Sequence, residues 1–296
     1  MSKVRASPIL KWAGGKQGIA SRLVELFPSH FDRYYEPFVG GGSVLFSLRP
    51  SSAVIGDAND WLIDTYLAVR EDYARVAKIL DGLENSKEEY VRIRQVLPET
   101  LPISQRAAHL IYLNKTCFRG LFRVNQRGQF NVPYGQYNRR YYDPDNLQAA
   151  AEVLNNVEFR RGDFELCLHD VTRKDFVYMD PPYYKLGGYS DFNRYTKDQF
   201  RENDHFRLAA FCRELDLRGV HWAVSNSNTP FIHQLFSGYH LTDIKNRREI
   251  NLNSENRNIT ELLITNYVPT THQTQASLFE PVNPEKLVPT ASSQSR

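Results

Sequence analysis

Seven short runs rich in β-branched and aromatic residues recur along this chain of 296 residues, and helical patterns separate most of them. Such an alternation is typical of an open sheet that carries helices on its faces. An apolar content of 41% is enough for a real core. We therefore predict an α/β fold with an open sheet, whose strands lie at 34–38, 52–59, 157–163, 175–181, 220–227, 239–246 and 259–267.

This alternation is interrupted in one part of the chain. Four successive helical patterns occur there, and a basic, aromatic stretch at 118–142 follows them. We predict that 62–147 form a mostly helical domain, inserted into a sheet domain that is made of 1–61 and 148–269. The predicted helices, including one that belongs to the sheet domain, cover 61–70, 73–83, 88–97, 106–113 and 204–215.

Composition and spacing argue against several classes of protein. No stretch approaches the roughly 18 consecutive apolar residues of a membrane span, and the first residues lack the apolar core of a signal peptide. Cys117, Cys167 and Cys212 form no CxxC pair, and the eight histidines show no metal-binding spacing. We therefore expect a cytoplasmic protein with no membrane partner, no disulfide framework and no metal site.

Basic residues are concentrated in one part of the chain. Between Glu99 and Asp143 there is no acidic residue, and the basic residues there are Arg106, Lys115, Arg119, Arg123, Arg127, Arg139 and Arg140. The formal net charge of +3 says little by itself. The local asymmetry, however, suits a polyanionic partner.

A glycine-rich turn from Glu36 to Ser43 lies where the first strand should end and a helix begin. In open α/β sheets this crevice is where nucleotide-like ligands bind, and the second strand ends at Asp57, which is well placed for ribose hydroxyls. Together they outline an adenosyl site. A turn without a ligand stays open as an alternative. A P-loop fits poorly, because Lys16 lacks the upstream glycine and the following hydroxyl residue, and Gly40 to Ser43 do not match GxGxxG.

The tetrapeptide Asp180-Pro181-Pro182-Tyr183 ends an apolar strand, and its prolines fix an extended backbone. The Asp180 carboxylate and the Pro181 carbonyl can accept the two hydrogens of an aromatic amine, whose lone pair is delocalised into its ring. Such an amine is methylated by positioning and charge complementarity rather than by a strong base. A base that reaches this pocket must flip out of a duplex, and Tyr183 offers it an aromatic face.

With these motifs the chain resembles the Dam-type DNA adenine methylases, of the D12 class and α-group. The resemblance implies a class I S-adenosylmethionine-dependent methyltransferase fold, S-adenosyl-L-methionine as cofactor, and methylation of adenine N6 in double-stranded DNA. It covers about 8–268 and is carried by Leu10 to Lys16, Glu36 to Ser43, Asp57, Tyr112 to Asn114, Gly120, Leu121, Arg123, Asn125, Phe130 to Pro133 and Asp180 to Tyr183.

The resemblance also implies roles for residues around the cofactor. Trp12 and Lys16 would line its pocket, and Asp57 would hold the ribose. Asp180 would touch both the cofactor and the target amine. The other residues implied at this site are Phe38 and Gly40, near the methionine part, and Asp163 and Phe164, which would face the adenine ring.

In the basic stretch, the likeness implies a loop that enters the DNA and fills the gap left by the flipped base with residues such as Phe118, Arg119 and Leu121. Arg119 departs from the asparagine of the best-known members. Arg123 and Lys11 match residues that contact guanines, which makes GATC the expected target. Further expected DNA contacts are Lys115, Asn125, Arg127, Tyr137, Arg139 and Arg140, in which the basic side chains meet phosphates or remain solvated.

Several expectations concern the rest of the chain. We expect a mobile lid from Gly187 to Arg194 and a basic loop with Arg247 and Asn253 near the DNA. The polar segment 270–296 is predicted to be a disordered tail. Its residues Gln275 to Phe279 resemble peptides that bind the bacterial replication sliding clamp, and the clamp is therefore a second expected partner of an otherwise monomeric, prokaryotic or phage-encoded protein.

Two other functions stay open. One is a DNA-binding protein with a catalytically inactive methyltransferase fold, which would be expected to lack Asp180, Asp57 or the glycine turn. The other is methylation of a different planar amine, such as adenine in RNA or N4 of cytosine. Enzymes of that kind commonly carry serine or asparagine in place of Asp180. Both alternatives are weaker, because all of these features are present.

Overall fold

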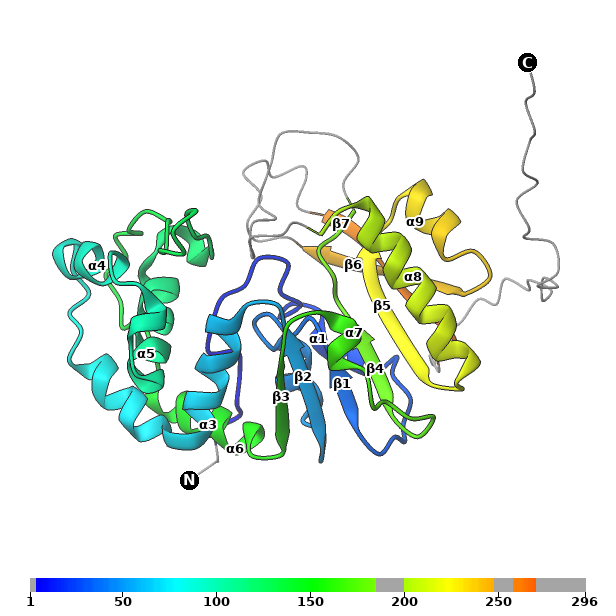
Figure 1. Ribbon diagram of the computed structural model, residues 1–296, viewed down its shortest axis with the longest axis horizontal. Helices are drawn as coiled ribbons and strands as arrows, with labels where there is room; N and C mark the ends of the chain where they lie inside the picture. Colours follow the sequence, from blue (N-terminus) through cyan, green and yellow to red (C-terminus); the bar gives the residue numbers. More distant parts are fainter. Residues whose placement is uncertain (1–3, 185–199, 248–257, 270–296) are drawn as a thin grey trace, which may run out of the picture.

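One seven-stranded sheet forms the centre of the molecule, and its strands follow the order β3-β2-β1-β4-β5-β7-β6 (Figure 1). The computed structural model describes residues 4–184, 200–247 and 258–269. The strands are β1 (Tyr34–Glu36), β2 (Ala53–Asp57), β3 (Val157–Arg161), β4 (Phe176–Met179), β5 (His221–Ser227), β6 (His240–Arg247) and β7 (Asn258–Thr265).

Strands β1 to β5 pair in parallel, whereas β7 runs antiparallel between β5 and β6. The carboxyl ends of the five parallel strands therefore meet at one edge of the sheet. Each predicted strand overlaps an observed one, and five of the seven contain it fully, whereas β6 and β7 each extend one residue beyond the prediction, so the predicted α/β open sheet is confirmed. The arrangement is also consistent with a class I S-adenosylmethionine-dependent methyltransferase fold.

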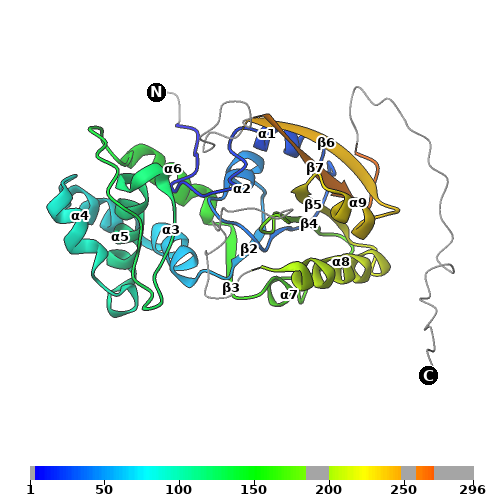
Figure 2. The ribbon, with the colours of Figure 1, turned by 90° about the horizontal axis from the view of Figure 1, so that it is seen from above.

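Helices cover both faces of the sheet, because neighbouring residues of each strand point to opposite sides. Tyr34 of β1 packs into one apolar cluster with residues of α1, α2 and α3, while Tyr35 packs into a second cluster with α7, α8 and α9. Figure 2 shows α1 and α2 on one side of the sheet, and α7 and α8 on the other. These helices are α1 (Ala20–Val24), α2 (Ser43–Leu48), α3 (Asp60–Asp81), α7 (Phe164–Cys167), α8 (Glu202–Leu217) and α9 (Pro230–Leu235).

The two helices predicted at 61–70 and 73–83 form one element, α3, whose backbone breaks at Asp72. From the sheet, α3 leads to a helical group that contains α4 (Lys87–Arg94) and α5 (Ile103–Thr116), and α6 (Pro144–Leu154) returns the chain to β3 (Figure 1). The apolar cluster that contains Tyr34 also includes residues of α5. The helical group and the sheet thus share one core, and the predicted boundary at 61/62 lies just inside α3.

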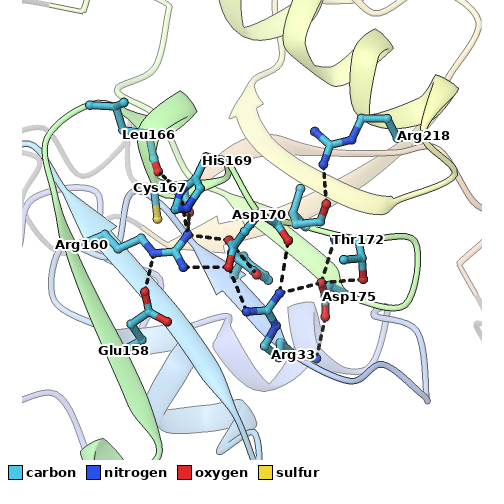
Figure 3. A network of polar contacts seen from close by, with 12 residues as sticks. Arg33, Glu158, Arg160, Leu166, Cys167, His169, Asp170, Thr172, Asp175 and Arg218 are labelled. Atoms are coloured by element: carbon cyan, nitrogen blue, oxygen red, sulfur yellow. Dashed lines mark hydrogen bonds and ion pairs between the residues drawn. The ribbon is translucent and has the colours of Figure 1, made fainter.

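A polar network reinforces the sheet near the amino ends of β1 and β4, away from the carboxyl edge (Figure 3). The guanidinium of Arg160 on β3 binds both oxygens of Asp170, at 2.6 and 3.0 Å, and Arg33 binds one of them at 3.1 Å. These arginines hold the pKa of Asp170 well below its usual range. Asp175 accepts hydrogen bonds from the Arg33 backbone and from Thr172. The network therefore ties β1, β3 and the segment before β4 together.

Within the described residues, no helix is both long and apolar enough to cross a bilayer. Several short or capped helices were not among the predicted ones: α1, α2, α6, α7 and α9. Two of these begin with a capping side chain followed by proline, Asp143-Pro144 at α6 and Thr229-Pro230 at α9. That pair is an ordinary helix-start signal.

Candidate active site

The carboxyl edge of the sheet gathers most of the residues predicted to bind a cofactor. The glycine turn follows β1, Asp57 ends β2, and Asp180 follows β4. Gly40 has a φ of +46°, and a Cβ there would come within 2.7 Å of the Trp12 ring. Trp12 therefore packs directly on the turn, and only glycine permits this approach.

Asp57 organises the glycine turn from the neighbouring strand. Its Oδ2 accepts the backbone N–H of Gly40 at 3.1 Å, and its Oδ1 accepts that of Asn59 at 2.9 Å. Burial raises the pKa of Asp57 to about 6, although these hydrogen bonds act in the opposite direction. A carboxylate has about four lone-pair sites, which is more than these backbone hydrogen bonds occupy. The geometry therefore leaves the predicted ribose contact available.

Asp180 forms a buried ion pair with Lys16, and the sequence did not reveal that these residues meet. The Nζ of Lys16 lies 2.7 Å from Asp180 Oδ2, and the two side chains are 3% and 17% exposed. The same Nζ donates to the carbonyl of Gly14 at 2.7 Å. Lys16 is thus not a solvated charge, and it holds one oxygen of Asp180 in place.

The other oxygen of Asp180, Oδ1, is buried and has no hydrogen-bond partner. Burial raises the pKa of Asp180 to about 6, while Lys16 opposes that shift. On the adjacent strand end, the Oδ1 of Asn226 accepts the amides of Ser227 and Tyr184, whereas its Nδ2 is buried and likewise without a partner. An acceptor and a donor are therefore left unsatisfied at neighbouring positions, a pattern that marks a ligand site.

Glu261 completes the surroundings of Asp180 from β7, and it was not among the predicted site residues. It lies 4% exposed, and its Oε2 accepts the hydroxyl of Tyr183 at 2.8 Å. The same oxygen lies 3.9 Å from the Nζ of Lys16. The only sequence signal was an acid within the apolar run of the last strand.

A second buried acid, Glu36 of β1, lies near Asp180 and was also missed as an individual site residue. It accepts the hydroxyl of Tyr34 at 2.9 Å and is 2% exposed. Burial raises its pKa to about 8, and Asp180 adds to this shift. Glu36 is therefore mostly protonated at neutral pH, which avoids placing a further negative charge beside Asp180.

Of the residues expected to face an adenine ring, Phe164 is 2% exposed and packs 5.5 Å from Phe38, centroid to centroid. Phe38 is only partly buried and offers the more accessible ring. Asp163 caps α7 through the amide of Glu165 and forms an ion pair with Arg207 at 2.6 Å. These three residues therefore lie together at the carboxyl edge: Phe38 follows β1, and Asp163 and Phe164 follow β3.

Lys11 is joined to the predicted DNA-binding stretch by Asn114, a fully buried residue of α5. The Asn114 side chain accepts the Lys11 amide at 2.7 Å and donates to the carbonyls of Lys11 and Gly120, at 2.9 and 3.2 Å. Gly120 has a φ of +66°, and a Cβ there would lie 2.4 Å from the Lys11 side chain. The structure thus brings Lys11 against the start of the stretch.

The residues predicted to enter the DNA lie on a short 3₁₀ turn, Phe118–Gly120. Phe118 is 47% exposed, whereas Leu121 packs against the core. Arg119 adopts a left-handed backbone with a φ of +60°, and its amide donates to the hydroxyl of Tyr137 at 2.9 Å. Tyr137 therefore supports the shape of this turn from the opposite side.

Arg123 is exposed, but its guanidinium binds the backbone carbonyl of Asn131 in the same loop, at 2.5 and 3.0 Å. Asn125 organises the loop tip: its Oδ1 accepts the amides of Arg127 and Gln129. Asn125 thus has a structural role that its predicted DNA contact did not include. Arg127 is exposed at the tip.

Lys115 lies beneath this stretch at the end of α5. Burial lowers its pKa to about 8, and the charges of Lys11 and Arg139 lower it further. Arg139 lies over the Tyr137 ring at 5.0 Å, and Arg140 over the Tyr142 ring at 5.4 Å. Lys115 is therefore repelled by the charges of both Lys11 and Arg139, and such a group of cations suits contact with phosphates.

Some predicted segments fall outside the described residues. These are the lid from Gly187 to Arg194, Asn253 of the basic loop, and the tail 270–296 with Gln275 to Phe279. Arg247 ends β6, but only its backbone is described. These predictions remain as they were.

Comparison with known proteins finds similarity over most of the chain. The family described as D12 class N6 adenine-specific DNA methyltransferase matches residues 12–250. The type II methyltransferase M.MjaIII of Methanocaldococcus jannaschii is 39% identical over 89% of this chain and 100% of its own length. The type II methyltransferase M1.LlaDCHI of Lactococcus lactis subsp. cremoris is 36% identical, over 90% and 97%. A DNA adenine methylase of Serratia marcescens is 33% identical, over 89% and 98%.

Proposed function

We propose, from the premise that this chain belongs to the D12 class of N6 adenine-specific DNA methyltransferases, that it methylates a flipped adenine within GATC in double-stranded DNA, with S-adenosylmethionine as donor. That the chain is an adenine-specific DNA methyltransferase follows from its membership of this family. The target sequence, the donor and the roles of individual residues are the proposal.

The observation that supports the proposal most strongly is that the two carboxylate oxygens of Asp180 differ in their contacts. Lys16 binds Oδ2, while Oδ1 is buried and without a partner. A buried carboxylate oxygen without a donor is unfavourable by itself. The amino group of a bound adenine supplies such a donor. Asp180 is therefore set to accept one amino hydrogen before the reaction begins.

The other groups of the tetrapeptide position the base. The Pro181 carbonyl accepts the second amino hydrogen, and the two prolines keep it rigid because they fix the backbone. Tyr183 is held through its hydroxyl, so its ring can serve as a stacking face. The unsatisfied amide of Asn226 is available to a ring nitrogen of the same base. This combination of acceptors and a donor matches adenine and excludes guanine, whose edge has a carbonyl and an N–H.

The described residues also fit an adenosyl cofactor. When bound, S-adenosylmethionine supplies an electrophilic methyl group on a positively charged sulfur. The free lone pairs of Asp57 suit its ribose, the accessible ring of Phe38 its adenine or methionine part, and Trp12 closes the glycine turn. Asp180 provides negative charge toward the reaction centre, and its Oδ1 can take the amino proton released after transfer.

Target recognition is assigned to Arg123 and Lys11. An arginine that binds a guanine edge discriminates by about 1–3 kcal/mol. To do so, Arg123 must exchange the Asn131 carbonyl for the base. Lys11 needs no such change, because Asn114 already holds its backbone beside the turn at Gly120.

The test is to express the protein in a host deficient in adenine methylation and to sequence its DNA with detection of modified bases. We expect methylated adenine in GATC with the wild type and with the control Asp32→Ala, an exposed aspartate before β1. Asp180→Ala should show no methylation and should bind duplex DNA within a few-fold of the wild type. Methylation at another sequence would refute GATC. Near-normal methylation by Asp180→Ala would refute the role of Asp180.

A further inference from the structure

Glu261 is an acidic side chain inside the apolar strand β7, and the methyl-transfer chemistry described above does not use it. Its neighbours Leu262, Leu263 and Ile264 are all buried, and Glu261 itself is 4% exposed. Burying a carboxylate is unfavourable unless charge and hydrogen bonds compensate for the loss of water. Its position therefore calls for an explanation in terms of what it contacts.

Two contacts of Glu261 are with residues of the active site. Its Oε2 accepts the Tyr183 hydroxyl at 2.8 Å and lies 3.9 Å from the Nζ of Lys16. The environment raises the pKa of Tyr183 well above its ordinary value, so the phenol remains protonated and donates. Glu261 pairs with Ser227 across the sheet, which places it beside the carboxyl end of β5.

These contacts close a ring of four side chains. Asp180 binds Lys16, Lys16 approaches Glu261, and Glu261 binds Tyr183, which belongs to the same tetrapeptide as Asp180. The Nζ of Lys16 also lies 4.7 Å from the centre of the Tyr183 ring. The first and last side chains of the tetrapeptide are thus both fixed, one through Lys16 and the other through Glu261.

We propose that Glu261 is a positioning residue for methyl transfer: it fixes the Tyr183 ring and sets how strongly Lys16 is shared with Asp180. This inference rests on the proposed roles of Asp180 and Tyr183. In this proposal Glu261 acts through Tyr183 and Lys16 and not by direct contact with the base or the cofactor. An amine has to be held within a narrow range of positions for attack, and small displacements of a stacking ring reduce the rate strongly.

The charge of Glu261 also affects Asp180. Burial is the main cause of the raised pKa of Asp180; Lys16 lowers this pKa, and Glu261 raises it. Asp180 must be ionised to accept an amino hydrogen, so activity should fall as the pH drops below about 6. Removing the charge of Glu261 should move this acid limb to lower pH. Among the residues that the structure describes, the titratable groups that interact with Asp180 are Lys16 from the N-terminal segment, Tyr34 and Glu36 from β1, Tyr178 from β4, Tyr183 and Glu261.

The experiment compares Glu261→Gln and Glu261→Ala in single-turnover methylation of plasmid DNA from a host deficient in adenine methylation, between pH 5 and 8. The glutamine retains the shape and an acceptor for Tyr183, so we expect a loss of only a few-fold and an acid limb at lower pH. The alanine leaves Tyr183 without this acceptor, and we expect a loss of on the order of tenfold or more. Binding of the duplex should be unchanged for both.

A double-mutant comparison tests whether Glu261 acts through Tyr183. Tyr183→Phe removes the hydroxyl but keeps the ring. If the hydroxyl is the route, adding Glu261→Ala to Tyr183→Phe should reduce the rate less than Glu261→Ala does in the wild type. The matched control is Asp64→Asn, a carboxylate of α3 that is 6% exposed and is paired with Arg106 and Arg161. It should leave the acid limb unmoved.

The inference is overturned if Glu261→Gln moves the acid limb no more than Asp64→Asn does, or if the effects of Glu261→Ala and Tyr183→Phe simply add. A loss that follows only from a lower melting temperature would likewise make Glu261 structural. A failure of the proposed function looks different. In that case the wild type itself does not methylate adenine, or Asp180→Ala remains active. Either result would be seen whatever the rates of the Glu261 variants are.

Discussion

The carboxyl edge of the sheet and the stretch at 118–142, which we propose as the recognition stretch, are prepared for their proposed functions in opposite ways. At the sheet edge, Lys16, Asp180 and Glu261 are buried and hold one another by direct contacts. In the recognition stretch, Phe118 is 47% exposed, and Arg123 binds a carbonyl of its own loop. The first region is thus already arranged for its proposed chemistry, whereas Arg123 would have to exchange an internal contact for its proposed DNA contact.

Physical requirements explain this difference. Groups that stabilise developing charge are effective only when they are fixed before the reaction and shielded from water. Side chains that read base edges must instead project from the surface, where most of their donors meet solvent or nearby backbone. The residue that connects the two regions is Asn114, which binds the backbone of both Lys11 and Gly120. Variants of each region should therefore fail in different measurements.

The largest effect is expected for Lys16→Met. Removing the cation leaves Asp180 buried without the charge that holds Oδ2 and lowers its pKa. We expect the single-turnover rate to fall on the order of 100-fold, since preorganised charge is lost. The acid limb should move to higher pH, because the pKa of Asp180 rises without Lys16. The rate as a function of pH measures both effects.

The control variant for Lys16→Met is Lys174→Met, which changes an exposed lysine just before the amino end of β4. The control measurement is binding of duplex DNA. Both proteins should bind plasmid fragments as the wild type does. If Lys16→Met lost DNA affinity and kept its rate, the division between a catalytic edge and a recognition stretch would be wrong.

Arg123→Ala should have the next largest effect, and it should act on sequence preference. Loss of a bidentate contact to guanine corresponds to about 1–3 kcal/mol, or roughly 5- to 150-fold in kcat/KM for the preferred site. Sites with a substituted guanine should be affected much less. Steady-state methylation of matched and substituted duplexes measures this difference. An equal reduction on all duplexes would assign Arg123 to phosphates instead.

The fold was largely accessible from the sequence because buried strands form apolar β-rich runs that need no knowledge of their partners. All seven were found, and the break of α3 at Asp72 separates the two helical patterns predicted there. The short helices α1, α2, α7 and α9 span too few turns to show a helical period. For α6 the pair Asp143-Pro144 was a usable signal that the prediction did not use.

The active site was only partly accessible, because the sequence shows which residues end strands but not which side chains meet. Asp57 and Asp180 follow strands, so their shared edge could be predicted. The contact of Glu261 with Tyr183 depends on the spatial order of β4, β5 and β7. The ion pair of Lys16 with Asp180 depends on where the segment before α1 crosses the sheet edge. Nothing local to Glu261 marks it except an acid in an apolar strand.

Arg127→Ala should have a smaller effect than Arg123→Ala. Arg127 is exposed at the loop tip, and Asn125 holds only its backbone amide. If it contacts a phosphate, its removal should weaken binding to every duplex a few-fold and reduce the slope of log K against log salt by about 0.9. Titrations of two unrelated duplexes at several salt concentrations measure this slope. A changed sequence preference with an unchanged slope would contradict the assignment.

The smallest effect on activity is expected for Asp170→Asn, in the network at the amino ends of the strands (Figure 3). Asp170 is 35% exposed, so solvent screening limits the loss of stability to about 1 kcal/mol, or roughly 2 °C in Tm. Its pKa is lowered in the folded state, so this stabilisation is present above the unfolded pKa of about 3.9 and is lost as the pH falls below it. The Tm difference between wild type and Asp170→Asn should therefore be constant from pH 5 to 7 and shrink below about pH 4. A change in methylation rate at 25 °C would mean that this framework also adjusts the active site.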